Sequence, residues 1–451
     1  MGTAEELFLR LPYSLRCLAA SIKSAHLNMT RRGGRYKEFR SEIESRVNWS
    51  SSDFSEYQDE QLRRLFSECL ESVPYYQNCQ SYRVLGSRSE SPSEILLQLP
   101  ILEKSVIRGR EEQFVSARVP RKNRLRISTT GTTGTPLTVW TSETDRQRNF
   151  AFFDSFLGGV GVNLQGRRVV IGGRLLVPED ASSPPYWVRD VWKNTLLMSA
   201  YHISEATISS YAQKLRMYRP DYIEAYPSAL SLIAAMANKK NLPLPTVPHI
   251  VTSSETLSSS QRSAIESAFN AQVFDQYGTA EMSVFVAECP HRRYHARSDF
   301  GVLEVDGAQQ VGDFVCTSFV NQTMPLLRYR IGDAGKIGVA ECVCGQPGPI
   351  VEAILGRVDD VIIAADGRRI GRMSPVLKGF PIIESQFRQD EVGKVRLLVV
   401  PAPGYSTATT SEILAAINRR LGSNTEVDLQ LVERIERGAG GKVKSVVSTI
   451  L

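Results

Sequence analysis

The stretch that decides the fold is Ile127-Ser128-Thr129-Thr130-Gly131-Thr132-Thr133-Gly134-Thr135-Pro136-Leu137, a run of hydroxyl side chains and glycines. Glycine lets backbone N–H groups approach an anion closely, and serine and threonine hydroxyls add side-chain donors. The stretch therefore predicts a loop that holds phosphate oxygens. A P-loop needs Lys and then Ser or Thr directly after its last glycine, and Thr135-Pro136 stand there instead. For the loop taken alone, a polar turn without a ligand is the alternative.

Three further motifs follow the loop in order along the chain. They are Tyr277-Gly278-Thr279-Ala280-Glu281, Tyr329-Arg330-Ile331-Gly332-Asp333 and Gly356-Arg357-Val358-Asp359-Asp360. In this order and at these separations, the four resemble the core motifs of adenylate-forming enzymes, the superfamily of acyl-CoA synthetases, luciferases and peptide-synthetase adenylation domains. Two upstream segments resemble the phenylacetate-CoA ligase and CapK branch, namely Val73-Pro74-Tyr75-Tyr76 and Leu99-Pro100-Ile101-Leu102-Glu103-Lys104.

The resemblance implies a role for each motif residue. The departing phosphates of ATP would be held by Ser128, Thr129, Thr130, Gly131, Thr132, Thr133 and Gly134. Tyr277 would stack by the adenine with Gly278 beside it, and Thr279 would contact the α-phosphate. Glu281 would carry Mg²⁺, and Asp333 would accept both ribose hydroxyls, a role suited to an acceptor-only carboxylate. For either acid taken singly, a solvated loop residue is the alternative.

The same resemblance implies a mobile lobe with a catalytic lysine. Arg357 and Asp359 occupy the family's hinge motif, where the small lobe rotates between half-reactions. Gly440-Gly441-Lys442-Val443-Lys444 resembles the terminal catalytic-lysine motif, although the usual preceding proline is missing and Lys444 replaces the customary arginine. We expect Lys442 to be the catalytic lysine because it follows the glycine, and Lys444 is the alternative.

The seven cysteines are too few and too scattered for a disulfide framework, and four of them lie between residues 289 and 344. Cys289, His295, Cys342 and Cys344 supply three thiolates and an imidazole, a ligand set suited to a tetrahedral structural Zn²⁺ site. His291 could replace His295, and unrelated reduced thiols are the alternative. The phenylacetate-CoA ligase branch, which the chain resembles, includes some members with a Cys/His cluster here. Cys316 lies on an apolar run and is expected in the core.

Composition excludes several classes of protein. Of the 451 residues, 42% are hydrophobic and 23% charged, as in an ordinary globular chain. No apolar run reaches the ~18 residues of a membrane helix, and Arg10 and Arg16 interrupt the apolar stretch of the N-terminus, so we expect a cytoplasmic protein without a membrane span. The net charge of +6 comes with basic clusters that lack interleaved aromatic residues, so no nucleic-acid partner is expected.

The pattern of apolar runs predicts an α/β fold. Residues 1–90 are mostly helical, and strands at 168–173, 222–226, 249–252 and 272–276 alternate with helices, which implies crossover connections and a mostly parallel sheet flanked by helices. A small mobile α+β lobe follows, with a strand at 395–400 and a helix that Thr409 caps and Gly422 ends. We therefore expect an N-terminal domain of residues 1–357 and a C-terminal lid domain of residues 358–451.

The function implied by the resemblance is ATP-dependent activation of a small carboxylic acid, aryl or acyl, to an acyl-adenylate with release of pyrophosphate. Transfer of the acyl group to CoA, with AMP as the by-product, would follow. The first alternative is a CapK-like ligase that passes the acyl group to an amine or a sugar in surface-polysaccharide or specialised-metabolite biosynthesis. The second is a non-catalytic nucleotide-binding relative. A homodimer is a candidate assembly.

Overall fold

The computed structural model describes residues 3–86, 90–128, 137–178, 180–338, 341–357, 361–366, 368–371, 373–377, 379–437 and 443–450. The chain divides into two compact units, each drawn from segments far apart in the sequence. The first unit consists of Met1–His26, Gly161–Asp275 and Asp359–Leu451, and the second of Leu27–Val160 and Gln276–Val358. The domain boundary predicted between residues 357 and 358 stays a prediction.

The first unit contains a layer of strands and helices formed by the middle of the chain. Its elements are α1 (Thr3–Arg10), the first part of α2 (Tyr13–Arg32), β3 (Arg168–Gly172), β4 (Trp187–Asp190), β5 (Thr195–Ser199), α9 (Ile208–Tyr218), β6 (Tyr222–Ala225), α10 (Pro227–Lys239), β7 (His249–Ser253), α11 (Ser259–Phe269) and β8 (Gln272–Gly278), which leads into the second unit. The strands lie in the order β4-β5-β3-β6-β7-β8. The pairs β3–β5, β3–β6 and β6–β7 are parallel, as the sequence predicts, whereas the edge pair β4–β5 is antiparallel.

The first residues of helices α10 and α11 are types that favour the start of a helix. Pro227 occupies the first turn of α10, where its missing N–H costs nothing, and the helix buries Leu230 and Ile233 completely. Ser258 and Gln261 form a capping box at the start of α11. These helices belong to one hydrophobic core with strand residues such as Ile223.

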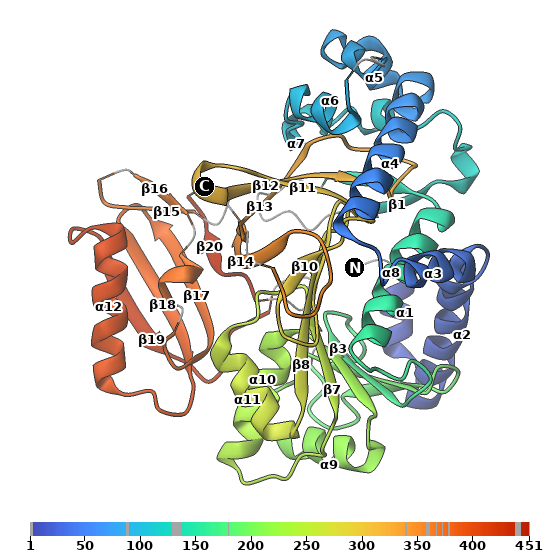
Figure 1. Ribbon diagram of the computed structural model, residues 1–451. Helices are drawn as coiled ribbons and strands as arrows, with labels where there is room; N and C mark the ends of the chain where they lie inside the picture. The colour runs from blue at the N-terminus through green and yellow to red at the C-terminus, as the bar shows by residue number, and fades with distance from the viewer. Residues whose placement is uncertain are drawn as a thin grey trace. The chain divides into compact units, whose positions relative to one another are not determined.

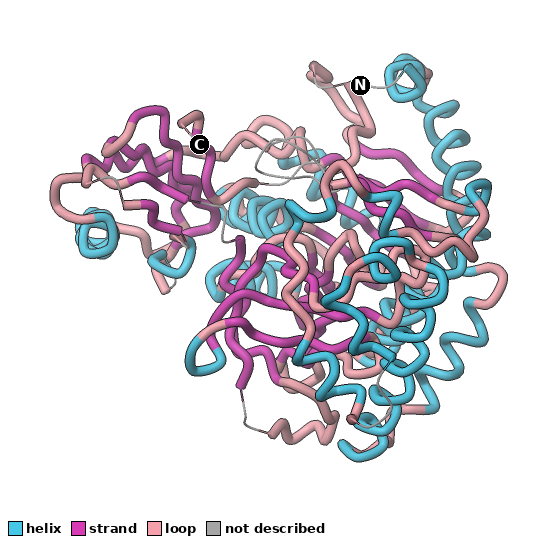
Figure 2. Tube along the Cα trace, turned by 90° about the horizontal axis from the view of Figure 1, so that it is seen from above, coloured by secondary structure: helices cyan, strands magenta, loops and turns pink. Residues whose placement is uncertain are grey.

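The C-terminal part of the first unit is a small α+β layer (Figures 1 and 2). Its elements are β15 (Val361–Ile363), β16 (Arg369–Gly371), η5 (Ser374–Leu377), β17 (Ile382–Glu391), β18 (Lys394–Pro401), α12 (Thr407–Leu421), β19 (Glu426–Leu431) and β20 (Val446–Ser448). Four strands lie in the order β19-β18-β17-β20, and α12 lies against them through Ile413 and Ile417. The sequence placed the cap of α12 at Thr409, which is wrong. Ser406 is the N-cap and Thr409 is its capping-box partner, while Gly422 ends the helix as predicted.

The second unit combines the helical N-terminal region with antiparallel strands. Its elements are the end of α2, α3 (Tyr36–Ser45), α4 (Ser51–Ser72), α5 (Pro74–Asn78), η1 (Gln80–Gly86), α6 (Pro92–Gln98), α7 (Lys104–Ile107), η2 (Glu111–Phe114), η3 (Arg121–Asn123), β1 (Leu125–Ser128), β2 (Thr138–Thr141), α8 (Glu143–Gly159), the end of β8, β9 (Phe285–Glu288), β10 (Tyr294–Ala296), β11 (Gly301–Asp306), η4 (Ala308–Gln310), β12 (Val311–Ser318), β13 (Tyr329–Gly338) and β14 (Ile350–Arg357).

Strand pairing in the second unit is antiparallel, in the order β8-β9-β10-β14-β13-β12-β11. The expectation of a mostly parallel sheet therefore holds for the strands between residues 168 and 253 and not for those after β8, so the fold is α/β with mixed pairing. Successive strands such as β11 and β12 are joined by turns, and a parallel pair would need a crossover of a dozen or more residues. Cys316 of β12 is fully buried in the core, as predicted.

The sequence predicts neither a disulfide framework nor a membrane span, and the described residues bear on both points. All seven cysteines belong to them, and none is paired in a disulfide. Among the described helices, we find none that combines the length and the apolar character required to cross a membrane.

Candidate functional site

The predicted phosphate loop connects two short strands of the second unit. Strands β1 and β2 pair in antiparallel register, with Ser128 directly opposite Thr138, and Ser128 is exposed at the end of its strand. The other predicted loop residues lie outside the described residues, namely Thr129, Thr130, Gly131, Thr132, Thr133 and Gly134. The structure thus fixes where the loop starts and ends, and the phosphate-binding role stays a prediction.

Tyr277 and Asp333, from two different motifs, meet in the second unit. The phenol Oη of Tyr277 at the end of β8 donates a hydrogen bond to Oδ2 of Asp333 in β13, at 2.7 Å. Burial, and then the Asp333 carboxylate, raise the pKa of Tyr277 well above its ordinary value, so the phenol keeps its proton and holds the acid in place. Gly278 follows Tyr277, and a Cβ there would lie 2.9 Å from Nε2 of the Gln276 side chain and 3.3 Å from the carbonyl oxygen of Val284.

Glu281 is buried, with an exposed fraction of 5%, in the turn that follows β8. Tyr329, fully buried in β13, donates a hydrogen bond from Oη to Oε1 of Glu281 at 3.1 Å. Burial, followed by the Glu281 carboxylate, raises the pKa of Tyr329, which makes this phenol a permanent donor at neutral pH. Thr279 shapes the same turn, since its hydroxyl accepts the backbone N–H of Ser283 at 3.2 Å. A held, desolvated carboxylate is a suitable ligand for a hard cation.

Strand β13 is also fixed from the other side by the segment around Leu102. The N–H of Leu102 donates to the carbonyl of Arg328, and the N–H of Arg330 donates to the carbonyl of Leu102. Lys104 adds a hydrogen bond from Nζ to the carbonyl of Ile331 at 2.6 Å. The upstream segment that resembles the CapK branch therefore supports the strand that carries Tyr329 and Asp333.

Arg330 of the same motif faces three carboxylates. It forms ion pairs with Glu103 at 2.8 Å, Asp306 at 2.7 Å and Asp313 at 2.8 Å. Burial opposes its charge, but the hydrogen bonds that Arg330 donates to Glu103 and Asp306 outweigh that cost and raise its pKa. The guanidinium thus ties β11, β12 and β13 together, which is a structural task that the motif alone did not reveal.

The remaining predicted catalytic residues lie at the limit of what the structure describes. Arg357 is the last residue of β14, and its backbone pairs in register with Asp333 of β13. Asp359 and Lys442 lie outside the described residues. Lys444, the alternative to Lys442, is exposed, and its carbonyl accepts a hydrogen bond from Nε2 of Gln386 at 3.1 Å.

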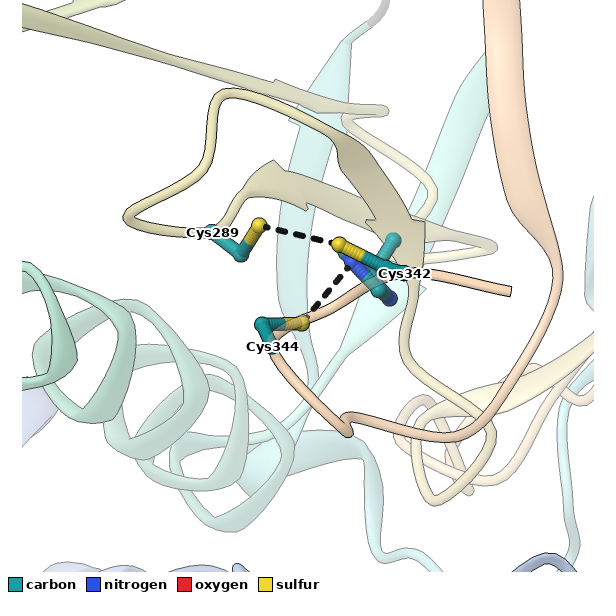
Figure 3. Close-up of side chains that lie close together, drawn as sticks. Cys289, Cys342 and Cys344 are labelled. Carbon is teal, nitrogen blue, oxygen red and sulfur yellow. Dashed lines mark hydrogen bonds between the residues drawn. The ribbon is translucent and has the colours of Figure 1, made fainter. Parts of the chain in front are cut away.

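The predicted metal ligands come together as a compact cluster in the second unit. The ligand atoms of Cys289, His295, Cys342 and Cys344 all lie within 4.8 Å of one another. Figure 3 shows the three labelled cysteines with their sulfurs pointing toward a common centre. Cys289 follows β9, His295 is part of β10, and the other two cysteines lie in the connection from β13 to β14. Residues 53 positions apart in sequence are therefore neighbours.

The distances in the cluster match those of a tetrahedral zinc site. Sγ of Cys289 lies 3.8 Å from Sγ of Cys342, and Sγ of Cys344 lies 3.4 Å from Nε2 of His295. With Zn–S bonds of about 2.3 Å and Zn–N bonds of about 2.0–2.1 Å, a tetrahedron sets sulfurs about 3.8 Å apart and sulfur and nitrogen about 3.6 Å apart. These two pairs have the separations that Zn²⁺ requires, and all four ligand atoms lie within 4.8 Å of one another.

His295 has the protonation state that a metal ligand needs, whereas Cys344 would have to lose its proton when a metal binds. Burial, together with Arg293 and Arg297, lowers the pKa of His295, so its imidazole is neutral at pH 7, the form that binds metals. Burial raises the pKa of Cys344 to about 12, and the neighbouring thiols act in the same direction. The N–H of Gln346 donates to Sγ of Cys344 at 3.4 Å, a contact that favours the thiolate. A bound cation would supply the charge that such closely spaced thiolates require.

Sequence reasoning missed the partners of the predicted acids. Tyr329 is part of one of the predicted motifs, yet its contact with Glu281 joins positions 48 residues apart. Neither residue type nor spacing marks such a pair in a single sequence.

The amino-acid sequence is similar to those of known proteins. A model of the CapK C-terminal domain matches residues 362–449. Protein CapK of Staphylococcus aureus is 26% identical over 408 residues, which cover 88% of this chain and 90% of that protein. Phenylacetate-coenzyme A ligase of Thermus thermophilus is 24% identical over 328 residues, covering 68% of this chain and 71% of the relative.

Solved structures share the fold. The crystal structure of 2-hydroxyisobutyryl-CoA ligase in the postadenylation state, in complex with R3-HIB-AMP, superposes with a TM-score of 0.63 at 18% identity, covering 86% of this chain and 88% of that one. The same enzyme in complex with 2-HIB-AMP and CoA, in the thioesterification state, gives a TM-score of 0.55 at 19% identity, with coverage of 89% and 91%. The chain therefore shares the fold of an adenylate-forming CoA ligase and is similar over most of its length to protein CapK, and its residues 362–449 match the CapK C-terminal domain.

Proposed function

We propose that this protein is an AMP-forming ligase that activates a small carboxylic acid with ATP. The observation that carries the proposal is the pair of acids Glu281 and Asp333, each held by a buried tyrosine phenol on the elements that bear the superfamily motifs. Such positioned carboxylates are unusual in surface loops, and they match the two tasks that ATP imposes, namely binding Mg²⁺ and accepting ribose hydroxyls.

In the first half-reaction, a carboxylate oxygen of the substrate attacks the α-phosphorus and the bond to pyrophosphate breaks. Asp333 accepts the ribose hydroxyls, Tyr277 lies by the adenine with Gly278, and Thr279 contacts the α-phosphate. Glu281 would hold Mg²⁺, which would supply positive charge to the phosphates. The loop Ser128–Gly134 donates hydrogen bonds to the departing pyrophosphate, and Lys442 offsets the repulsion between carboxylate and phosphate.

In the second half-reaction, the nucleophile attacks the carbonyl carbon of the acyl-adenylate, and AMP leaves with the electron pair of the broken C–O bond. We propose CoA as the nucleophile, with its thiol losing a proton, because the thioester-forming relatives cover most of the chain. Rotation of the residues after 357 about the Arg357–Asp359 hinge would withdraw Lys442 for this step.

A second acceptor is favoured by one specific observation. The match to protein CapK is more extensive than that to phenylacetate-coenzyme A ligase, and the C-terminal domain matches the CapK model. An amine or a sugar hydroxyl would then take the acyl group, giving an amide or an ester in place of the thioester. The aryl or small-acyl nature of the acid is part of the proposal, and so is a structural Zn²⁺ bound by Cys289, His295, Cys342 and Cys344.

The test is pyrophosphate release across a panel of aryl, acyl and amino acids, with and without CoA. We expect release with at least one acid, and Asp333→Asn should raise the KM for ATP by about 10-fold or more, because it replaces one acceptor oxygen by an NH2 donor and removes the negative charge. Asp366→Asn, at an exposed position outside the site, is the matched control. No release with any acid, from folded protein supplied with ATP and Mg²⁺, would refute catalysis and leave the non-catalytic alternative.

A further inference from the structure

One carboxylate of the first unit, Glu255, joins three separate segments of the chain. It lies just after β7, and its side chain is 10% exposed. Its Oε2 accepts the backbone N–H of Ser228 at 3.1 Å, and its Oε1 accepts the backbone N–H of Val443 at 3.2 Å. Ser228 belongs to the first turn of α10, where unpaired N–H groups and the helix dipole favour a negative charge.

Arg437, which precedes residues 438–442 in the sequence, forms an ion pair with the same carboxylate. Its Nη1 lies 4.0 Å from Oε1 of Glu255 and donates to Oγ of Ser228 at 2.6 Å. Its Nη2 donates to Oε1 of Glu384 in β17 at 2.8 Å. The side chains of Arg437 and Glu384 are 5% and 1% exposed, so this guanidinium and its acids are removed from water together. Withdrawing one partner would leave a buried charge without its counter-charge, which is strongly unfavourable.

A second set of contacts holds β17 against α11. Oγ of Ser260 donates to the carbonyl of Ile382 at 2.6 Å, and Nε2 of Gln261 donates to the carbonyl of Ile383 at 2.8 Å. The side chains of Ile383 and Ile435 belong to the same hydrophobic core as helix α10. The CapK C-terminal domain is therefore docked on the strands and helices of its own unit by apolar packing, with the Glu255 network at the point where the chain passes through residues 437–443.

We propose that Glu255 is a positioning residue for adenylate formation, because it anchors the chain on both sides of residues 438–442, the segment in which the sequence places Lys442. The inference rests on the proposed function for the role of that lysine, and on described contacts for the anchoring. Because Arg437 and Val443 are held in place, less entropy is lost when a group close to them in sequence is brought to the reacting phosphate. The anchor therefore acts on the rate of the first half-reaction rather than on the affinity for ATP.

The test is Glu255→Gln, which keeps the shape of the side chain. It replaces one acceptor oxygen by an NH2 group, which cannot accept from the backbone N–H of Ser228 or Val443. We expect kcat for pyrophosphate release to fall about 30-fold, while the KM for ATP and the conversion of separately supplied acyl-adenylate stay within about twofold. Glu436→Gln is the matched control, because Glu436 lies next to Arg437 and its side chain is 88% exposed. A merely structural role would lower both half-reactions together. The proposal would be overturned by an equal loss in both half-reactions. It would also be overturned by a change confined to the KM for ATP, or by no change in either half-reaction.

A second variant and a second measurement keep the test decisive if Glu255→Gln folds poorly. Ser228→Ala removes the hydroxyl that Arg437 binds without changing any charge, and it should give a smaller defect, about threefold, in the same half-reaction. Hydrogen exchange of the Val443 amide in the full chain without substrates reports the anchor directly, and it should be at least about tenfold faster in Glu255→Gln. If the wild type releases no pyrophosphate with any acid, the proposed function fails. Hydrogen exchange of the Val443 amide still shows whether Glu255 holds the backbone at that position. Unchanged exchange overturns the anchor even in an active enzyme.

Discussion

Replacing Cys344 by Ser tests the metal centre in one step. A serine hydroxyl keeps its proton at neutral pH and is a poor zinc ligand, so the variant offers three ligands where the wild type offers four. At a free zinc concentration of about 1,000 times the Kd, a bound ion contributes about 4 kcal/mol to the stability of the folded state. For a cooperative unit of 150–250 residues, each kcal/mol corresponds to about 2–4 °C in Tm. We therefore expect the second unit to melt about 8–16 °C lower in Cys344→Ser.

The assay combines metal analysis with thermal unfolding of protein prepared without chelator. Wild-type protein should hold about one equivalent of zinc and the variant less than about a tenth. Cys316→Ser is the matched control, because this thiol is fully buried outside the cluster, so it should lower Tm through packing and leave the zinc content unchanged. Wild-type protein without zinc, or a Cys344→Ser variant that retains a full equivalent, would refute the four-ligand site.

Three further predictions concern the nucleotide loop, the lysine and pH. Changing both Thr132 and Thr133 to Val removes two hydroxyl donors at nearly constant shape, so pyrophosphate release should fall at least about 100-fold in a variant whose circular dichroism is unchanged; full activity would exclude the loop. Lys442→Ala should abolish adenylate formation and spare conversion of supplied acyl-adenylate, whereas Lys444→Ala should do little; the reverse pattern would move the catalytic role to Lys444. Burial raises the pKa of Glu384 from 4.5 to about 7, so the folded chain retains a proton that the unfolded chain has lost, and stability should fall as pH rises between these values. Denaturant titrations should show this slope in the wild type and lose it in Glu384→Gln.

The sequence predicts those parts of the fold that depend on local pattern. The apolar runs that became β3, β6, β7 and β8 are short and bounded by turn residues, and the capping box at Ser258 and Gln261 lies within four residues. The cap of α12 was misplaced because Ser406 and Thr409 both have a cap-forming hydroxyl. Only the backbone decides which of them precedes the first helical turn.

In the candidate site, too, some features can be predicted from the sequence and others depend on the folded backbone. The cluster around Cys289 could be predicted across a separation of more than 50 residues, because cysteine is rare and few chemical roles suit three thiols and a histidine. Tyrosine carries no comparable signal, so the phenols that hold Glu281 and Asp333 became visible only when the strands were paired. The anchoring by Glu255 depends on side chains from three segments, and no local pattern marks it.

The in-register pair of Asp333 and Arg357 has a consequence under the proposed function. If Asp333 binds the ribose and the chain turns at Arg357, the two events act on directly neighbouring positions of one strand ladder, β13 and β14. Nucleotide binding and the hinge equilibrium would then be coupled. By thermodynamic reciprocity, the factor by which bound nucleotide shifts the hinge equilibrium must equal the factor by which the hinge shifts nucleotide affinity. Departure of AMP would thereby reset the lobe, so that each turnover ends with the enzyme prepared for the next ATP.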